Sequence, residues 1–376
     1  MGTWRKLGIA ALSLGVAASL AACGSGGASG ASGGEDVEGS GTLDGGGETL
    51  VVFMPSTSNS YLAAGLDSIK AEAEELNFTV KSFENDFDQT EEDQQVQEWL
   101  ATGEDAAAIL YWPAAGEAAT NSIRQLSKKA PVFQFNQAVQ DDAQEFVTAY
   151  AGVSDYGIGE QAGKSALEAL AERQDAGVEF HGPDGKPNLI EFRFPTGYVA
   201  GDERHDSFVE TTDGAFNELT VEPLKAPDAQ SGYEAASQII PKFKADGIDF
   251  IYAQNNNSAT GVVQALEQNG LVAGEDVIVV AGDYSGDKQP LRDGKIHSAV
   301  VQSPVIEGAL IVRTAAQYLA TGEVTDETVT IPDDAEKPEA EIAAPAKVTY
   351  IMNPPVTADT YDSFKIWGMG IDELVK

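Results

Sequence analysis

Short apolar runs alternate with amphipathic helical patterns along most of this chain, and each apolar run ends in polar residues. The run at 249–253 is rich in β-forming residues, is too short for a helix, and ends at the amides of 254–257. Ser258 then caps a helical pattern, and a second apolar run at 277–281 stops at Asp283. This order predicts a parallel strand–helix–strand unit with polar side chains at the carboxyl ends of its strands, where open α/β sheets bind small ligands.

The same alternation fills the chain from residue 48 onward and passes through it twice. Four consecutive strand–helix units before residue 152 predict a doubly wound sheet, and the order then restarts without a residue-level repeat. The expected fold class is therefore α/β, with two doubly wound parallel-sheet domains facing each other across a ligand cleft. The predicted strands span residues 50–54, 78–83, 106–111, 131–135, 146–152, 188–194, 218–223, 249–253, 277–281, 296–302 and 348–352.

The first residues of the chain have the pattern of an export signal. A basic start at 4–6 precedes an Ala-rich apolar run at 7–20, which is too short for a confident membrane span. Leu20-Ala21-Ala22-Cys23 resembles a bacterial lipobox, which implies cleavage before Cys23 and a lipid on its sulfur; the alternative is an ordinary secretory signal with an incidental cysteine. The Gly- and Ser-rich residues 24–47 predict a flexible tether.

Composition excludes several classes of function. The 376 residues suffice for two domains, and the net charge of −37 argues against nucleic acid, whose binding needs Lys and Arg at the phosphates. The single cysteine allows no intrachain disulfide. His181, His205 and His297 lie in different loops without metal-ligand spacing, and Gly157–Ser165 fails the spacing of a phosphate-binding loop. We therefore expect no metal, no cofactor and no catalytic set.

The polar residues after successive strands carry a resemblance to a known family. Over residues 49–330 the chain resembles a periplasmic-type sugar-binding protein of the ribose/galactose kind, the solute receptor of an ABC importer. No single motif is specific, but their order on successive strand ends is. The motifs are Ser58-Asn59-Ser60-Tyr61, Trp112-Pro113, Asn136-Gln137, Ala253-Gln254-Asn255, Gly282-Asp283 and Gln302-Ser303-Pro304.

The resemblance implies the type I fold of such binding proteins, in which the chain crosses between two discontinuous domains three times. We place the crossings near 152, 302 and 340, so that three segments form the hinge. The expected organisation is a signal peptide at 1–22, a lipidated cysteine with its linker at 23–47, a first domain of 48–152 with 303–340, and a second domain of 153–302 with 341–376.

The candidate ligand-binding residues lie at the expected strand ends and crossings. Carboxylates and amides there can exchange hydrogen bonds with hydroxyl groups, and aromatic rings can cover the C–H face of a sugar. Each has a structural alternative: a helix cap, a hinge hydrogen bond or a core position, and for Trp112 a reshaped pocket. The set is Asn59, Tyr61, Trp112, Asn136, Arg204, Asp228, Asn255, Asp283 and Gln302.

The start of one second-domain helix departs from the family pattern. Related proteins usually present an arginine in this loop, whereas here the stretch reads Gly201-Asp202-Glu203-Arg204-His205. Arg204 is either that cleft arginine or part of a structural ion pair, and Asp202 and Asp228 would add negative charge at the cleft mouth. A neutral sugar, a polyol and an amino-bearing solute all remain compatible with these residues.

The sequence thus predicts an extracytoplasmic, lipid-anchored and monomeric receptor. It would capture a small hydroxyl-rich ligand and present it to the permease of an ABC importer at the outer face of the membrane. Two alternatives remain open: an exported α/β enzyme acting on a nucleoside or sugar, and a sensory partner of a membrane receptor.

Overall fold

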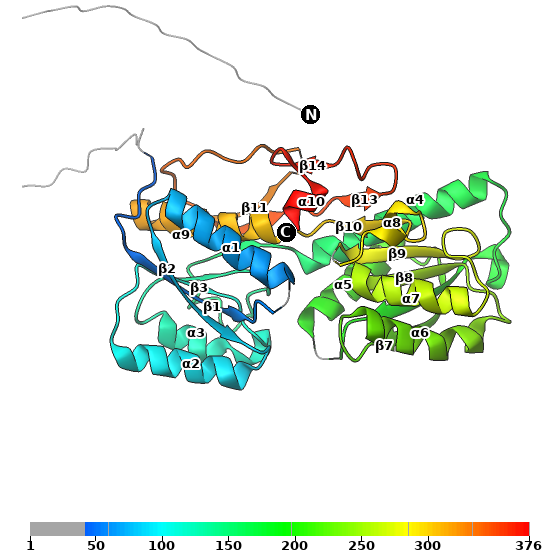
Figure 1. Cartoon of the computed structure of the whole chain (residues 1–376), viewed down its shortest axis with the longest axis horizontal. Coiled ribbons are helices and arrows are strands. Elements are labelled where there is room, and N and C mark those ends of the chain that lie inside the picture. Colours follow the sequence, from blue (N-terminus) through cyan, green and yellow to red (C-terminus); the bar gives the residue numbers. More distant parts are fainter. Residues whose placement is uncertain (1–41, 59, 197, 285, 333, 376) are drawn as a thin grey trace, which may run out of the picture. The chain divides into compact units, whose positions relative to one another are not determined.

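The computed structural model describes residues 42–58, 60–196, 198–284, 286–332 and 334–375, which form two large β-sheets flanked by helices (Figure 1). The expected signal peptide, Cys23, the tether up to residue 41 and Asn59 lie outside the described residues. Among the described helices, none combines the length and the apolar character needed to cross a bilayer.

The first sheet has seven parallel strands in the order β11-β12-β5-β4-β3-β1-β2. Its central strands are buried on both faces, and alternate residues of one strand therefore enter different cores. Its strands are β1 (Thr49–Pro55), β2 (Thr79–Asn85), β3 (Ala108–Tyr111), β4 (Val132–Gln134), β5 (Ala149–Gly152), β11 (Thr325–Ile331) and β12 (Ala346–Ile351), and its helices are α1 (Ser60–Glu75), α2 (Gln89–Thr102), α3 (Thr120–Leu126) and α9 (Pro304–Thr321), with the short turn η1 (Gly116–Ala118).

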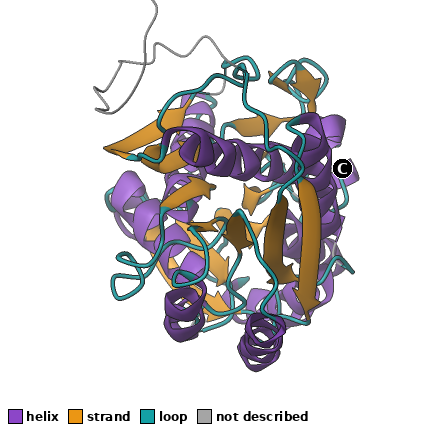
Figure 2. Ribbon diagram, turned by 90° about the vertical axis from the view of Figure 1, so that its left-hand side faces the viewer, coloured by secondary structure: helices purple, strands orange, loops and turns teal. Residues whose placement is uncertain are grey.

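Strand β1 shows this division directly. Leu50 and Val52 belong to the core cluster that includes residues of α1 and α9, whereas Val51 and Phe53 pack with residues of α2 and α3. Helices on both faces are thus what the continuous apolar pattern of the strand requires, and Figure 2 shows helices on either side of strands.

The second sheet repeats the same winding with six strands in the order β13-β10-β9-β8-β6-β7, in which only β13 runs antiparallel to its neighbour. The predicted fold class is therefore confirmed. Its strands are β6 (Asn188–Arg193), β7 (Asn217–Pro223), β8 (Phe250–Asn255), β9 (Ile278–Asp283), β10 (Ser298–Val300) and β13 (Pro355–Thr357), and its helices are α4 (Asp155–Asp175), α5 (Val199–Thr212), α6 (Ala229–Phe243), α7 (Asn256–Gln268) and α8 (Gln289–Arg292), with the short turn η2 (Pro183–Gly185).

The late strands correct the expected course of the chain. Residues 341–376 were expected in the second domain, but β12 pairs in parallel with β5 of the first sheet. The chain returns to the second sheet only at β13, so this passage lies between 351 and 355 rather than near 340. The remaining C-terminal elements are the hairpin β14 (Lys365–Ile366) and β15 (Met369–Gly370) and the single turn α10 (Ile371–Leu374).

Two local expectations are also wrong. The tether was expected to be flexible through residue 47, but Leu43 is buried and its backbone N–H donates to the Ala340 carbonyl at 3.3 Å. The cap expected at Ser258 lies three residues earlier, because the side chain of Asn255 accepts a free backbone N–H group of α7.

Candidate functional site

A cavity of about 220 Å³ lies where the carboxyl ends of strands from both sheets approach each other. Seven of the nine residues predicted from the sequence line it, and they come from both domains. They are Tyr61, Trp112, Asn136, Arg204, Asn255, Asp283 and Gln302. These seven residues therefore share one cavity, although the contacts of each side chain differ. That they bind a ligand stays a prediction.

Arg204, on α5, is buried and its guanidinium group is engaged by protein groups on every side. Its Nε donates to Asp155 Oδ1 at 2.8 Å, and one terminal nitrogen donates to the Gln254 carbonyl at 2.7 Å and to Asp283 Oδ2 at 2.6 Å. The other terminal nitrogen lies 2.7 Å from Asp155 and 3.5 Å from Gln302 Oε1. Arg204 therefore combines the two predicted alternatives: it lines the cavity, and it forms ion pairs with Asp155 and Asp283. Through these contacts the arginine positions Asp283 and Gln302.

The acid partners of Arg204 differ in exposure. Asp155, at the start of α4, is buried, and burial raises the pKa of its carboxyl although Arg204 opposes the shift. Asp283, at the end of β9, keeps 13% of its side chain exposed and lines the cavity. A carboxylate held in place by a buried cation is preorganised to accept hydrogen bonds from ligand hydroxyl groups.

Asn255 and Asp228 have the structural roles that were their alternatives. Asn255 Oδ1 accepts the Ser258 N–H at 2.8 Å and its Nδ2 donates to the Pro227 carbonyl at 2.9 Å, so this cavity-lining amide is bonded to the protein at both ends. Asp228 caps α6 by accepting the Ser231 N–H at 2.7 Å, and it is not among the described residues that line the cavity. Aspartates that cap helices also follow strand ends, and Asp228 has that structural role in the described chain.

Glu307 is a buried carboxylate behind the first-domain wall, and it was not among the residues predicted from the sequence. It accepts hydrogen bonds from the Tyr61 hydroxyl at 3.1 Å, from Asn136 Nδ2 at 3.1 Å and from the Val153 N–H at 3.4 Å. Burial raises its pKa to about 7, against the effect of these three donors. Two side chains that line the cavity are therefore held by one carboxylate in the first turn of α9.

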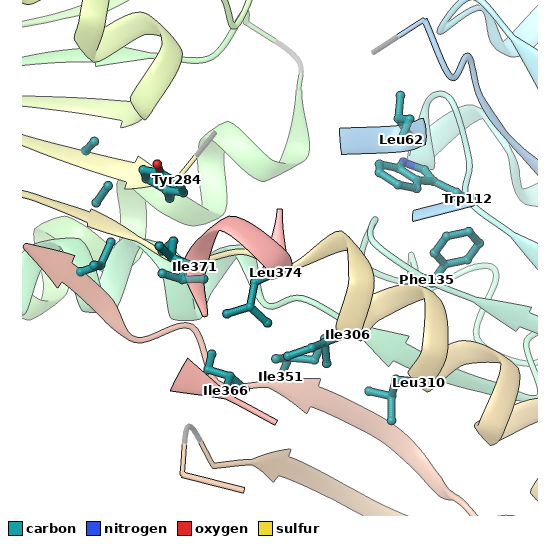
Figure 3. Packing of buried hydrophobic residues seen from close by; sticks show 14 of the residues in the cluster. Leu62, Trp112, Phe135, Tyr284, Ile306, Leu310, Ile351, Ile366, Ile371 and Leu374 are labelled. Atoms are coloured by element: carbon teal, nitrogen blue, oxygen red, sulfur yellow. The ribbon is translucent and has the colours of Figure 1, made fainter. Parts of the chain in front are cut away.

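Aromatic rings complete the cavity. The Trp112 ring packs edge-on against Tyr61 at 6.1 Å and against Phe135 at 5.5 Å between ring centroids, and Figure 3 shows Trp112 beside Leu62 and Phe135. From the second domain, the Tyr198 hydroxyl accepts a hydrogen bond from Gln137 Nε2 at 2.7 Å. Because Gln137 belongs to the first domain, this contact joins the two walls.

Several residues of the cavity were not singled out from the sequence. Asp155 and Tyr198 could be suspected only from their partners, which lie 49 and 61 residues away along the chain. Phe87 follows β2, and as an apolar residue it is not one of the polar strand-end residues by which the site was predicted. The further lining residues are Ser60, Leu62, Phe87, Gln137, Asp155, Phe194, Tyr198, Ala200, Pro227 and Asn257.

The model of the periplasmic binding protein domain family matches residues 50–323 of the chain. The galactofuranose-binding protein YtfQ of Escherichia coli is 22% identical over 67% of this chain and 76% of its own length, and the fructose import binding protein FruE of Bifidobacterium longum is 23% identical over 85% and 90%.

Among solved structures, an ABC transporter solute-binding protein from Bacillus halodurans with bound myo-inositol superposes with a TM-score of 0.65. It is 19% identical, and the match covers 86% of this chain and 99% of that chain. At this identity the likeness concerns the fold, and it agrees with the two doubly wound sheets described above. The resemblance inferred from the strand-end motifs is confirmed: the chain belongs to the periplasmic binding protein family.

Proposed function

We propose that the protein captures a small, uncharged, hydroxyl-rich solute, a sugar or a polyol, and delivers it to an ABC importer. The observation that carries this proposal is the charge of the cavity wall. Its charged lining residues are Asp155, Arg204 and Asp283, and the one arginine among them is fully engaged by its partners. Among the described residues of this wall, an anionic ligand would meet two carboxylates and no uncommitted cation.

The rest of the wall suits the same ligand class. Amide and carboxylate groups exchange hydrogen bonds with hydroxyl groups, and rings such as Trp112 offer apolar area to the C–H face of a sugar. The relatives whose names specify galactofuranose and fructose, and the myo-inositol complex, support a cyclic polyhydroxylated solute. The excess of acid favours an amino sugar as the second candidate.

We further propose that the protein binds and releases this solute without transforming it, as a monomer anchored through Cys23 to the outer face of the cell membrane. The basic start, apolar run and Leu20-Ala21-Ala22-Cys23 support the anchor. Metabolic labelling with a radioactive fatty acid tests it: the wild-type chain should carry label in the membrane fraction, and Cys23→Ala should not. Label on the variant would contradict the anchor.

A thermal-shift panel tests the ligand class. We expect at least one of D-galactose, D-fructose, L-arabinose, D-ribose, D-allose and myo-inositol to raise the melting temperature, because binding to the folded state stabilises it by mass action. D-glucosamine tests the second candidate, and D-galacturonate serves as the anionic control. Stabilisation by the galacturonate alone, or turnover of a nitrophenyl glycoside without any shift, would overturn the proposal.

A further inference from the structure

Phe87, between β2 and α2, combines three features that are unusual together. Its backbone has a φ of +57°, in the left-handed region that side chains with a β-carbon disfavour. Its side chain is 50% exposed, although it is a large apolar ring. It also lines the cavity between the two domains. The left-handed backbone of Phe87 costs free energy, and a ring that stays exposed contributes little hydrophobic burial to offset that cost.

The backbone on both sides of Phe87 is fixed by side-chain hydrogen bonds. The Asp86 N–H donates to Glu91 Oε2 at 3.0 Å, and Asp88 Oδ1 accepts the Thr90 N–H at 2.8 Å as the cap of α2. Before them, Asn85 is buried and its Nδ2 donates to the Met54 carbonyl at 3.2 Å. The loop thus holds Phe87 in its left-handed conformation, and the ring is presented at the cavity.

Other residues with positive φ show why Phe87 is different. Asn77 and Asp213 have φ values of +58° and +43°, and their short polar side chains tolerate the left-handed region. Trp367 has a φ of +52°, but its ring is only 9% exposed and belongs to a core cluster, so burial offsets the backbone cost. Phe87 has neither a short polar side chain nor a ring buried in a core cluster. Strained residues of this kind concentrate at ligand clamps.

We propose that Phe87 is a specificity-determining residue that covers the apolar face of a ring-shaped ligand bound in the cavity. This inference rests on the proposed function and narrows it to cyclic sugars and cyclitols, because an open-chain polyol presents no flat face to the ring. The compensation that the fold lacks is supplied by the ligand: burial of the phenyl ring between solute and protein removes its apolar surface from water.

The test compares two truncations of the ring with a matched control. For whichever of D-galactose, D-fructose, L-arabinose and myo-inositol bind the wild-type chain, calorimetry should give a dissociation constant about tenfold higher for both Phe87→Ala and Phe87→Gly. Phe87→Tyr keeps the flat face and should stay within about threefold of wild type. Asp213→Gly changes another left-handed position outside the cavity lining and should leave the affinity unchanged.

The melting temperatures of the ligand-free variants separate the two properties of Phe87. Phe87→Gly should melt above Phe87→Ala, because glycine adopts positive φ without penalty while both variants lack the ring. An unchanged affinity in Phe87→Ala and Phe87→Gly, with binding intact in the wild type, would overturn the role of Phe87 and leave the proposed function standing. Failure of every probe to bind the wild-type chain would count against the proposed function, and this inference would fall with it.

Discussion

The two walls of the cavity bury carboxylates in different ways. In the second domain, Asp155 and Asp283 share the cation of Arg204, so the wall is an ion-paired cluster. In the first domain, the described hydrogen-bond partners of Glu307 are all neutral: a tyrosine hydroxyl, an asparagine amide and a backbone N–H. The cation of Arg204 opposes the rise in pKa that burial causes at Asp155, whereas only neutral donors oppose that rise at Glu307.

Glu92 repeats the chemistry of Glu307 away from the cavity. It is buried on α2 and accepts hydrogen bonds from the Tyr111 hydroxyl at 2.7 Å, from Asn85 Nδ2 at 3.2 Å and from the Ala114 N–H at 3.1 Å. Burial raises its pKa to about 7, as it does for Glu307. None of its three donors lines the cavity, whereas two of the Glu307 donors do. The same kinds of donor thus surround both carboxylates. Around Glu92 they support the fold away from the cavity, whereas around Glu307 they also position two side chains that line it.

The largest effect is expected from breaking the ion-paired wall. Arg204→Met leaves Asp155 buried without its cation and should lower the free energy of unfolding by about 3–5 kcal/mol, measured by urea denaturation. Sugar binding should be lost at the same time, because Asp283 and Gln302 lose the group that positions them.

Arg204→Lys is the matched control for the arginine. It keeps a positive charge but cannot satisfy both carboxylates and the Gln254 carbonyl with a planar fork, so we expect an intermediate loss of stability. Equal stability of the wild type and Arg204→Met would show that the ion pair does not support the second-domain wall.

The next effect separates Glu307 from Glu92. For both groups the folded-state pKa of about 7 exceeds the value of 4.5 in the unfolded chain. Their contribution to stability is therefore fully present below pH 4.5 and is lost as the pH rises toward 7. Between these limits, the stability of wild type relative to Glu307→Gln or Glu92→Gln should fall by about 3 kcal/mol in each case.

Ligand affinity should respond to only one of the two substitutions, Glu307→Gln and not Glu92→Gln. Glu307→Gln removes an acceptor that holds Tyr61 and Asn136, so we expect the affinity for a bound sugar to fall several-fold at pH 8. Glu92→Gln should leave the affinity unchanged. The charged groups facing Glu307 include Asp155, and the tyrosines Tyr61 and Tyr150 lie beside it, with raised pKa values. Equal effects of the two substitutions on affinity would contradict the inference that Glu307 supports the ligand site and Glu92 does not.

The sequence predicted the fold well because the central strands of both sheets are buried on both faces and appear as continuous apolar runs. Strand β12 was misplaced for a physical reason: most of its residues are only half-buried, so its sequence does not reveal that it lies between β11 and β5 of the first sheet. The polar residues directly after buried strands, such as Asn136 and Asp283, reached the cavity as predicted. Sequence spacing could not reveal Glu307, whose donor Asn136 lies 171 residues away.

Helix caps are the harder case, because the same residue types cap helices and bind sugars at strand ends. Asp228 and Asp283 both follow second-domain strands, yet Asp228 bonds to the N-terminus of its own helix and Asp283 bonds to Arg204. Only the spatial neighbour distinguishes the two aspartates. The position of a carboxylate along the chain therefore predicts that it lies near a strand end, but not whether it caps a helix or lines the cavity.

The smallest expected effect tests this assignment of Asp228. Asp228→Ala removes the cap of α6 and should lower the free energy of unfolding by about 1 kcal/mol, while leaving sugar affinity unchanged. Asp228→Asn keeps a capping oxygen and should restore most of the stability. If Asp228→Ala lowers the affinity and Asp228→Asn does not restore it, Asp228 contributes to ligand binding as well as to the cap. Asp283→Ala gives the opposite pattern, because its carboxylate lines the cavity: we expect sugar binding to disappear while the folded chain remains.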